Sequence, residues 1–388
     1  MSFNDFMSRE EINNGRQKEV DLARAIPVIS LPFVHCVIEC CTQQNINEPI
    51  PFLFNVIIGA PLGAPIFVFA MGLSILYSKH HEPQDLMKRG LILFISGFIL
   101  NALRFGLNYL IGYAVTGDYD KFIAPIFYKI FGNDVLQFAG LALFLLGFLL
   151  SKKVPDLGIL GIAFVMSLIG WRFRHMNFGI PAVNVVFGHI IGTEEPNGFV
   201  LSDFPIMNWF MVPVAGYIFG KVLLRVKDKK KFYIPVMPIL AVLYWVYFAV
   251  ESRLHFGKMA GGATLVEEEN AYYHAETFDI ISYIVCAVGM MGIYFIITEI
   301  CPDVVNKFFN SVSRNITRIY FIHWLFVVLI TNVILYKING TQELPVYQIM
   351  ILALCIFLIS YFGALFIEKK TKERRAKKLE QTKSEQSE

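Results

Sequence analysis

The chain has few charged residues for its length, and this shortage is the first clue to its class. Only 17% of the 388 residues are Asp, Glu, Lys or Arg, whereas 55% are hydrophobic. Soluble domains have about 25% charged and about 45–50% apolar residues. The mean hydropathy of +0.54 and the 36 phenylalanines point the same way. We therefore expect lipid, and not water, to surround most of this protein.

Further absences narrow the class of protein. The net charge is only +3, and the lysines and arginines fall in short clusters instead of along one polar face, so a nucleic-acid partner is not expected. The six cysteines show no CxxC spacing, so we interpret them as small buried hydrophobes and not as a metal site. The polar N-terminus "MSFNDFMSREEINNGRQKE" lacks the apolar centre of a secretory signal, and no internal repeat is visible.

What the chain does contain is a series of apolar segments long enough to cross a bilayer. A span of about 20 apolar residues forms a helix because hydrocarbon offers no partner to unpaired backbone groups. The sequence thus predicts an all-α, polytopic membrane helical bundle of about ten transmembrane helices, with a short interfacial helix in "APIFYKIFGNDVLQ". The fifth span is short enough to be a partial one. The predicted spans are 22–41, 53–78, 89–115, 134–151, 157–172, 204–223, 233–250, 278–299, 316–336 and 346–367.

Clusters of Lys and Arg predict the topology. The side of the membrane that receives most of these residues faces the cytoplasm. An even number of spans then places both termini there, with 1–20 as a cytoplasmic segment, 21–368 as one integral membrane domain and 369–388 as a charged, disordered tail. The expected external loops, whose histidines should be exposed, are 42–52, 116–133, 173–203, 251–277 and 337–345.

The first span carries four ionisable residues within about 60° of a helical wheel. They are Asp21, Arg24, His35 and Glu39. Ionisable groups at membrane depth cost about 2.5 kcal/mol or more, so they usually face a cavity and mark function. His35 is the candidate general base, and Glu39, one turn away, is the candidate to orient it or to stabilise its cation. A histidine that only hydrogen-bonds a neighbouring helix is the alternative.

The same stretch, "DLARAIPVISLPFVH", resembles the opening of the acyltransferase-3 superfamily of integral membrane acyltransferases, where Asp-x-x-Arg is followed after ten residues by His. Four later stretches resemble the branch related to heparan-α-glucosaminide N-acetyltransferase, and the similarity covers most of 20–368. They are "GAPIFVFAMGLSILYSKHHEPQDLMKRGLILFISGFILN", "NDVLQFAGLALFLLG", "SDFPIMNWFMVPVAGYIFGK" and "SRNITRIYFIHWLF". The first helix departs from the pattern at Ala25, where Gly is usual, and at Pro27 and Pro32, which remove helical donors.

The resemblance implies a membrane-bound acyltransferase. Such an enzyme moves an acyl group, expected to be acetyl, from cytoplasmic acyl-CoA to a hydroxyl or amine of a glycan or related acceptor on the other side of the bilayer. Acyl-CoA, with acetyl-CoA expected, is then a cosubstrate, and no permanently bound cofactor is implied. The bacterial inner membrane is the expected location, because the chain is compact without a signal or a large luminal domain. The oligomeric state stays open, with a homodimer among the alternatives.

Basic residues near the cytoplasmic ends of the first and third spans are the candidates for binding the acyl donor. Guanidinium and ammonium groups suit phosphate oxygens, so we expect Arg24, Lys88 and Arg89 to hold the CoA phosphates. Asp21, the acidic member of the motif, is assigned to the same donor site. Ordinary positive-inside anchoring is the alternative for Lys88 and Arg89.

A second polar seam follows on the third span, where Asn101, Arg104 and Asn108 share an arc of about 60°. We expect Arg104 to stabilise the oxyanion formed at the thioester carbonyl, or to bind an acidic acceptor. A structural pairing of Arg104 with Glu39 is the alternative. Three further residues, at positions that resemble those of the family, are expected to line the pocket, and the last is a reserve candidate for catalysis: Gln137, Trp209 and His323.

Two other classes of protein compete with the enzyme. A transporter of a small solute would use the same intramembrane charges near the bilayer midplane, often within inverted repeats. No such repeat is visible, and a transporter does not require the spacing from arginine to histidine. A catalytically idle scaffold would leave the clustered charges as an unexplained cost.

Overall fold

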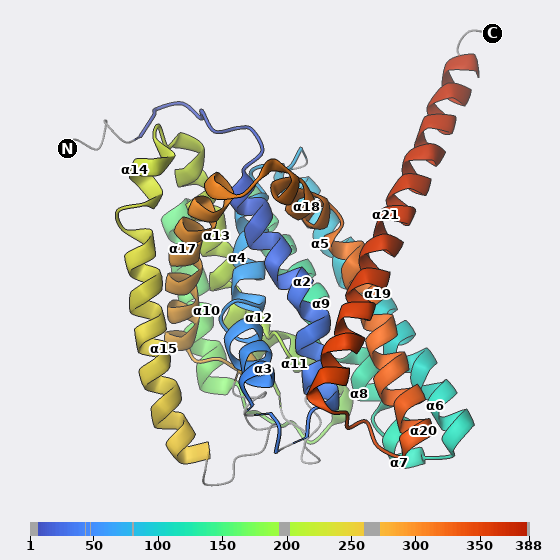
Figure 1. Ribbon diagram of the computed structural model, residues 1–388. Helices are drawn as coiled ribbons and strands as arrows, with labels where there is room; N and C mark the ends of the chain where they lie inside the picture. The colour runs from blue at the N-terminus through green and yellow to red at the C-terminus, as the bar shows by residue number, and fades with distance from the viewer. Residues whose placement is uncertain are drawn as a thin grey trace.

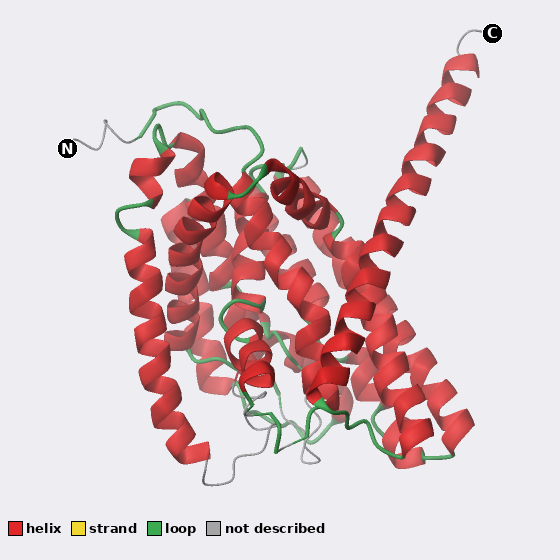
Figure 2. Cartoon of the chain, in the orientation of Figure 1, coloured by secondary structure: helices red, strands yellow, loops and turns green. Residues whose placement is uncertain are grey.

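The computed structural model describes residues 7–42, 44–46, 48–79, 81–193, 202–259 and 272–385. Every regular element within these residues is a helix, and no strand occurs among them (Figure 2). The long helices stand side by side as a bundle, from one end of which α21 projects (Figure 1). This architecture confirms the predicted all-α polytopic bundle.

The first half of the chain contributes α2 to α10 and two π-helical segments. These are α2 (Lys18–Cys40), α3 (Pro49–Phe52), η1 (Leu53–Gly59), α4 (Ala64–Ser74), α5 (Pro83–Asn101), η2 (Ala102–Leu107), α6 (Asn108–Thr116), α7 (Tyr119–Phe122), α8 (Ile126–Phe131), α9 (Val135–Ser151) and α10 (Asp156–Phe173).

The second half contributes the remaining helices and a third π-helical segment. These are α11 (Pro181–Ile191), α12 (Ile206–Trp209), α13 (Met211–Arg225), α14 (Lys229–Tyr233), α15 (Met237–Met259), α17 (Thr277–Ile300), α18 (Asp303–Arg314), α19 (Ile316–Val328), η3 (Leu329–Leu335), α20 (Tyr336–Asn339) and α21 (Val346–Glu385).

Nine helical stretches of the described chain are long and apolar enough to cross a membrane. They match nine of the ten predicted spans, and α5, η2 and α6 form one of them, Pro83–Thr116. The remaining predicted span, 134–151, is α9, whose 17 residues fall just short of that length. The fifth predicted span, thought to be partial, is α10 with 18 residues. The helix α8 confirms the short helix predicted before the fourth span.

The first spanning helix, α2, lies at the centre of the bundle and packs against α4, α17, α18, α19 and α21 (Figure 1). Pro27 and Pro32 lie inside it, yet the helix continues to Cys40. The Ser30 hydroxyl donates to the carbonyl oxygen of Pro27 at 2.8 Å. Prolines are tolerated in membrane helices when side chains and neighbouring helices satisfy or cover the backbone groups that they free. The dense packing around α2 provides that cover.

The helices α4 and α13 cross at van der Waals distance because glycine lies at the crossing. A Cβ atom on Gly72 would lie 1.9 Å from the carbonyl oxygen of Pro213, and one on Gly216 would lie 2.0 Å from that of Phe69. Small residues allow this approach, and dispersion then holds membrane helices together without a hydrophobic force between them. The contact fixes α4, which forms part of the wall of the central cavity described below.

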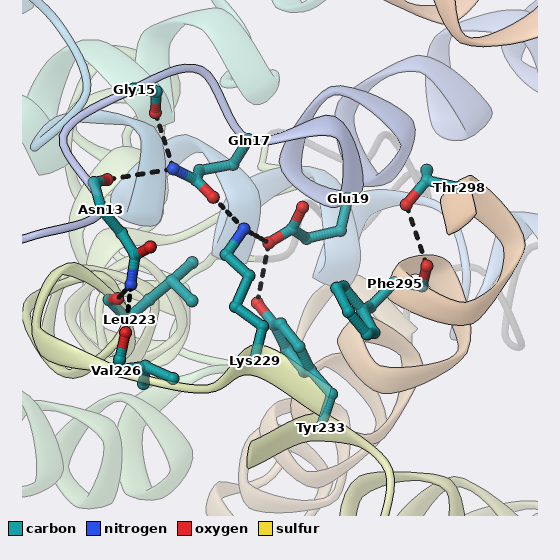
Figure 3. A network of polar contacts seen from close by, with 10 residues as sticks. All are labelled: Asn13, Gly15, Gln17, Glu19, Leu223, Val226, Lys229, Tyr233, Phe295 and Thr298. Atoms are coloured by element: carbon teal, nitrogen blue, oxygen red, sulfur yellow. Dashed lines mark hydrogen bonds and ion pairs between the residues drawn. The ribbon is translucent and has the colours of Figure 1, made fainter. Parts of the chain in front are cut away.

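A buried ion pair anchors the start of α2 (Figure 3). The Lys229 ammonium donates to the Glu19 carboxylate at 2.7 Å and also contacts the Gln17 side chain. The Tyr233 hydroxyl donates to the same Glu19 oxygen at 3.3 Å. The Asn13 amide donates to the carbonyl oxygen of Leu223 at 2.9 Å, so the segment before α2 is tied to the end of α13. These contacts hold α2 in register with α13 and α14.

One expected external loop, 173–203, contains the helix α11. His189 on this helix is buried and not exposed as expected, because its ring packs between Phe94 and Phe98 with centroids 5.9 Å and 5.6 Å away. The loop therefore folds back against the bundle instead of standing in solvent. Residues 194–201 and 260–271 of the expected loops lie outside the described residues.

The last helix, α21, continues to Glu385 through most of the segment that its charge suggests to be disordered. Ion pairs one turn apart support the extension: the Lys372 ammonium lies 2.7 Å from Glu368, and that of Lys370 lies 3.3 Å from Glu373. Such pairs stabilise a helix by about 0.2–0.5 kcal/mol each. The apolar span supplies the nucleus, so the charged residues only need to propagate a helix that already exists.

Candidate active site

A cavity of about 290 Å³ lies within the bundle, and we call it the central cavity. Its wall is formed by α2, α4, η2, the segment between α8 and α9, and α19. Polar side chains from helices far apart in the sequence meet there. Those that the argument below uses are His35, Glu39, Asn101, Arg104, Asp134 and Tyr320.

The imidazole of His35 lines the central cavity from the middle of α2. It packs against Trp324, with ring centroids 4.0 Å apart, and stacks on His323 at 5.6 Å. No hydrogen bond joins either of its nitrogens to another described residue. The ring is therefore held by aromatic contacts alone, and both nitrogens remain able to bond a molecule in the cavity.

His323 lies behind His35 and is completely buried. Its Nδ1 lies 3.2 Å from the carbonyl oxygen of Ile319. A carbonyl can only accept, so this contact places the hydrogen on Nδ1 and leaves a lone pair on Nε2. Nε2 has no hydrogen-bond partner among the described residues. His323 thus supports the ring of His35 from within the protein.

Arg104 carries a buried positive charge in the wall of the central cavity. Its Nη2 lies 2.6 Å from the Asp134 carboxylate, and its Nε donates to the Asn101 amide oxygen at 3.1 Å. The guanidinium carbon also lies over the Trp324 ring, 4.2 Å from its centroid. Nη1 has no partner within the described chain. The predicted alternative, a pairing with Glu39, does not form, because Asp134 occupies that role.

Asp134 is fixed at the start of α9 by its own backbone. It forms a capping box with Gln137: the Asp134 side chain accepts from the backbone N–H of Gln137, and the Gln137 side chain accepts from the backbone N–H of Asp134. Its second carboxylate oxygen accepts from the Tyr320 hydroxyl at 2.8 Å. The pattern Asp-x-x-Gln before an apolar run therefore builds both the helix and the partner of Arg104.

Glu39 lines the central cavity one turn beyond His35 but makes no described hydrogen bond to it. Its carboxylate accepts from the amides of Asn332 at 3.0 Å and Gln342 at 3.4 Å. The Lys121 ammonium donates to the Gln342 amide oxygen at 3.0 Å. Partial burial lowers the pKa of Lys121 below its ordinary value, and the negative charges of Glu39 and Asp118 oppose this shift only in part. A polar network thus holds the Glu39 carboxylate in place.

The residues predicted for the acyl donor do not line the central cavity. The Asp21 carboxylate pairs with Arg16 at 2.5 Å and accepts from the Ser313 hydroxyl at 2.8 Å. Arg24 lies within electrostatic range of Asp21, Arg16 and Arg89, and makes no hydrogen bond to another described residue. Lys88 is exposed on α5.

The structure therefore brings together four of the predicted residues in one cavity: His35, Glu39, Asn101 and Arg104. Other predicted residues have structural partners elsewhere. Gln137 caps α9, the Asn108 amide donates to the carbonyl oxygen of Leu325 at 3.4 Å, and the Trp209 indole donates to that of Tyr273 at 2.7 Å. Four further residues that line the cavity were not predicted from the sequence: Asn133, Asp134, Tyr320 and Trp324. For Asp134, the sequence signal is the helix-capping pattern Asp-x-x-Gln at 134–137.

Comparison with known protein families identifies the chain. The family model described as "Heparan-alpha-glucosaminide N-acetyltransferase, catalytic" matches residues 16–256. The chain belongs to this family. No curated protein and no solved structure matches it. The wider assignment to the acyltransferase-3 superfamily stays a prediction.

Membership of the heparan-α-glucosaminide N-acetyltransferase catalytic family establishes the broad activity. The chain is an integral, multi-pass membrane protein and an acyltransferase that transfers groups other than aminoacyl groups. The match includes α2, η2 and the start of α9, which carry His35, Arg104 and Asp134. It ends before α19, so Tyr320 and Trp324 belong to the part of the cavity outside the matched range.

Proposed function

We propose that this protein transfers an acetyl group from cytoplasmic acetyl-CoA to an amine or hydroxyl of a glycan on the other side of the membrane, with His35 as general base. The observation that carries the proposal is the position of His35. Its imidazole lines a cavity between the membrane-spanning helices, and neither of its nitrogens is hydrogen-bonded to another described residue. A base must reach the proton that it removes, and this ring is free to do so.

The proposed step is a direct acyl transfer. The acceptor nitrogen or oxygen attacks the thioester carbonyl carbon and loses its proton to His35, and the carbonyl oxygen takes up the negative charge. The carbon–sulfur bond then breaks, and the proton passes to the departing thiolate of CoA. Arg104 would stabilise the oxyanion through its unpaired Nη1, while Asn101 and Asp134 hold the guanidinium in place. The negative charge of Glu39 would favour the imidazolium formed on His35.

The donor would enter from the end of the bundle where the chain termini lie. Arg24 has no hydrogen-bond partner among the described residues and lies close to Arg89, so the two guanidinium groups together offer a site for CoA phosphates. Lys88 adds an exposed ammonium nearby, and Asp21 balances the charge through Arg16. Within this proposal 21–368 is the membrane catalytic domain, 1–20 lies in the cytoplasm, and the bacterial inner membrane is the location.

Family membership and the cavity favour the enzyme over a transporter. The match is to a catalytic domain, and one copy of the chain supplies every residue that the proposed step uses. The proposal therefore requires no second copy, and Asn108, Gln137 and Trp209 support the site through their structural contacts without lining the cavity.

The test is acetyl transfer from labelled acetyl-CoA to glucosamine by membranes that contain the protein. His35→Ala should lower kcat roughly 10²- to 10⁴-fold, the usual contribution of a general base. His189→Ala is the control, since His189 is a histidine inside the bundle that does not line the central cavity. Equal turnover by wild-type protein and His35→Ala would remove His35 from the mechanism.

A further inference from the structure

Asn133, directly before the catalytic-site carboxylate Asp134, has an amide whose orientation is fixed by the protein. Its Nδ2 donates to the carbonyl oxygen of Phe204 at 2.6 Å. Its backbone carbonyl oxygen accepts from the Asp203 amide at 3.0 Å, and its backbone also bridges to Ser202. With the backbone and Nδ2 both held, Oδ1 can point in only one direction.

That oxygen has no hydrogen-bond partner in the part of the chain that the structure describes. Asn133 is 2% exposed, and Oδ1 finds no donor among the described residues. A buried polar atom without a partner costs about 1–3 kcal/mol, so most are satisfied in native proteins. Asn133 is also one of the residues that line the central cavity. The central cavity is therefore the space nearest to this residue from which a bound molecule would offer the missing donor.

The place of Asn133 in the fold indicates whether this molecule is the acyl donor or the acceptor. Asn133 precedes the first residue of α9, and the other end of α9 leads to Lys152 and Lys153, which belong to the basic clusters on the side of the chain termini. The proposed acyl donor enters from that basic side. Asn133 therefore lies beside the end of α9 that is away from this basic side, and the acceptor would enter from there.

We infer that Asn133 is a binding residue for the acceptor, whose N–H or O–H donates a hydrogen bond to Oδ1 in the central cavity. The inference rests on the proposed function and adds a specificity-determining residue to it. Arg104, in the wall of the same cavity, has only hydrogen-bond donors and suits the carbonyl oxygen or oxyanion of the thioester, whereas Oδ1 of Asn133 only accepts and suits the N–H or O–H of the acceptor. Together the two residues bind both a hydrogen-bond acceptor and a hydrogen-bond donor of the reacting molecules.

Asn208 provides a matched control within the same chain. It too is buried, its Nδ2 donates to the carbonyl oxygen of Ala275 at 3.0 Å, and its Oδ1 has no hydrogen-bond partner in the described protein. It does not line the central cavity, and its Oδ1 instead packs against Gly170, where an added Cβ would lie 2.3 Å away. The two asparagines share their local chemistry and differ in access to the cavity.

The experiment measures acetyl transfer from acetyl-CoA to glucosamine by the purified full-length protein, with both substrates varied. Asn133→Ala should raise KM for glucosamine about tenfold, the effect of one lost hydrogen bond, and leave KM for acetyl-CoA within about twofold of the wild-type value. Asn208→Ala should change neither KM. If Asn133→Ala does not fold, Asn133→Ser, whose short side chain cannot reach as far, should give the same selective rise.

The outcomes separate the two proposals. A wild-type protein that transfers no acetyl group to glucosamine overturns the proposed function and, with it, this inference. An active wild-type protein whose KM for glucosamine is unchanged by the Asn133 variants overturns the inference alone. A rise in KM for acetyl-CoA in place of glucosamine also overturns it, because Asn133 would then contact the donor.

Discussion

At the scale of single residues, the central cavity depends on one ion pair. Arg104 and Asp134 lie 2.6 Å apart with side chains only 4% and 9% exposed, Asn101 accepts a hydrogen bond from Arg104, and Tyr320 donates one to Asp134. Two charges taken out of water are stable together only when the geometry is good and the remaining polar atoms are satisfied. Loss of either partner leaves the other as an uncompensated charge in the bundle.

Asp134→Ala should therefore lower the free energy of unfolding by about 3–5 kcal/mol, the range for breaking a buried pair. The comparison is Asp156→Ala, which removes the partner of Lys221. These two side chains are 2.7 Å apart but about two fifths exposed. That change should cost less than about 1 kcal/mol. Thermal unfolding in detergent measures both. Equal losses for the two variants would contradict the buried role of Asp134.

Part of this site could be predicted from the sequence, because helical periodicity determines which residues of one helix share a face. His35 and Glu39 share one face of α2, and Asn101 and Arg104 share one face of the third span, so their arrival in one cavity follows from 3.6 residues per turn. The partners of these residues do not follow. Asp134 meets Arg104 only because α5 packs against α9, and Asn332 meets Glu39 across about 290 residues of chain. Tertiary packing decides such pairs.

At the scale of secondary-structure elements, α2 is held at its first turn. Glu19 is 3% exposed at its side chain and bonds the Lys229 ammonium of α14, while Tyr233 donates to the same carboxylate (Figure 3). The rest of α2 carries His35 into the central cavity, so the position of the imidazole depends on this anchor.

Lys229→Met should destabilise the protein by roughly 3 kcal/mol, at the lower end for a buried pair because Lys229 itself is 23% exposed. Lys230→Met, at an exposed neighbour on the same helix, should stay within about 0.5 kcal/mol of wild type. Adding Glu19→Gln to Lys229→Met should restore part of the loss, since no unpaired carboxylate then remains. Denaturation midpoints of the four proteins test this, and a double variant less stable than Lys229→Met would refute it.

The helices themselves were largely predictable from the sequence. An apolar run of about 20 residues has few alternatives in lipid, so each predicted span has a helix in the structure. The helix α11 was not predicted, because its 11 residues are too few for a span and its burial depends on Phe94 and Phe98 of another helix. The continuation of α21 past its apolar span was not predicted, because net composition does not show the pairing of side chains at positions i and i+4.

At the scale of the whole molecule, positive charge gathers at one end of the bundle. The described start of the chain and the charged end of α21 lie at that same end (Figure 1). The basic residues that precede or follow spanning helices, such as Lys152, Lys229 and Arg314, belong to it as well. Because Lys and Arg concentrate in cytoplasmic segments, this end should face the cytoplasm, and the network of Glu39, Gln342 and Lys121 should face the outside.

Fusions to the full-length chain in a bacterial host test this orientation. A fluorescent protein that folds only in the cytoplasm should be bright when attached after Glu388, and alkaline phosphatase, active only outside the cytoplasm, should be inactive there. Cysteine introduced at Thr341, an exposed residue beside Gln342, should react with an impermeant maleimide on intact cells, above the background of the native cysteines. Cysteine introduced at Lys230 should react only after lysis. The reverse pattern would put the basic end outside, and Arg24 and Arg89 could then not meet a cytoplasmic acyl donor.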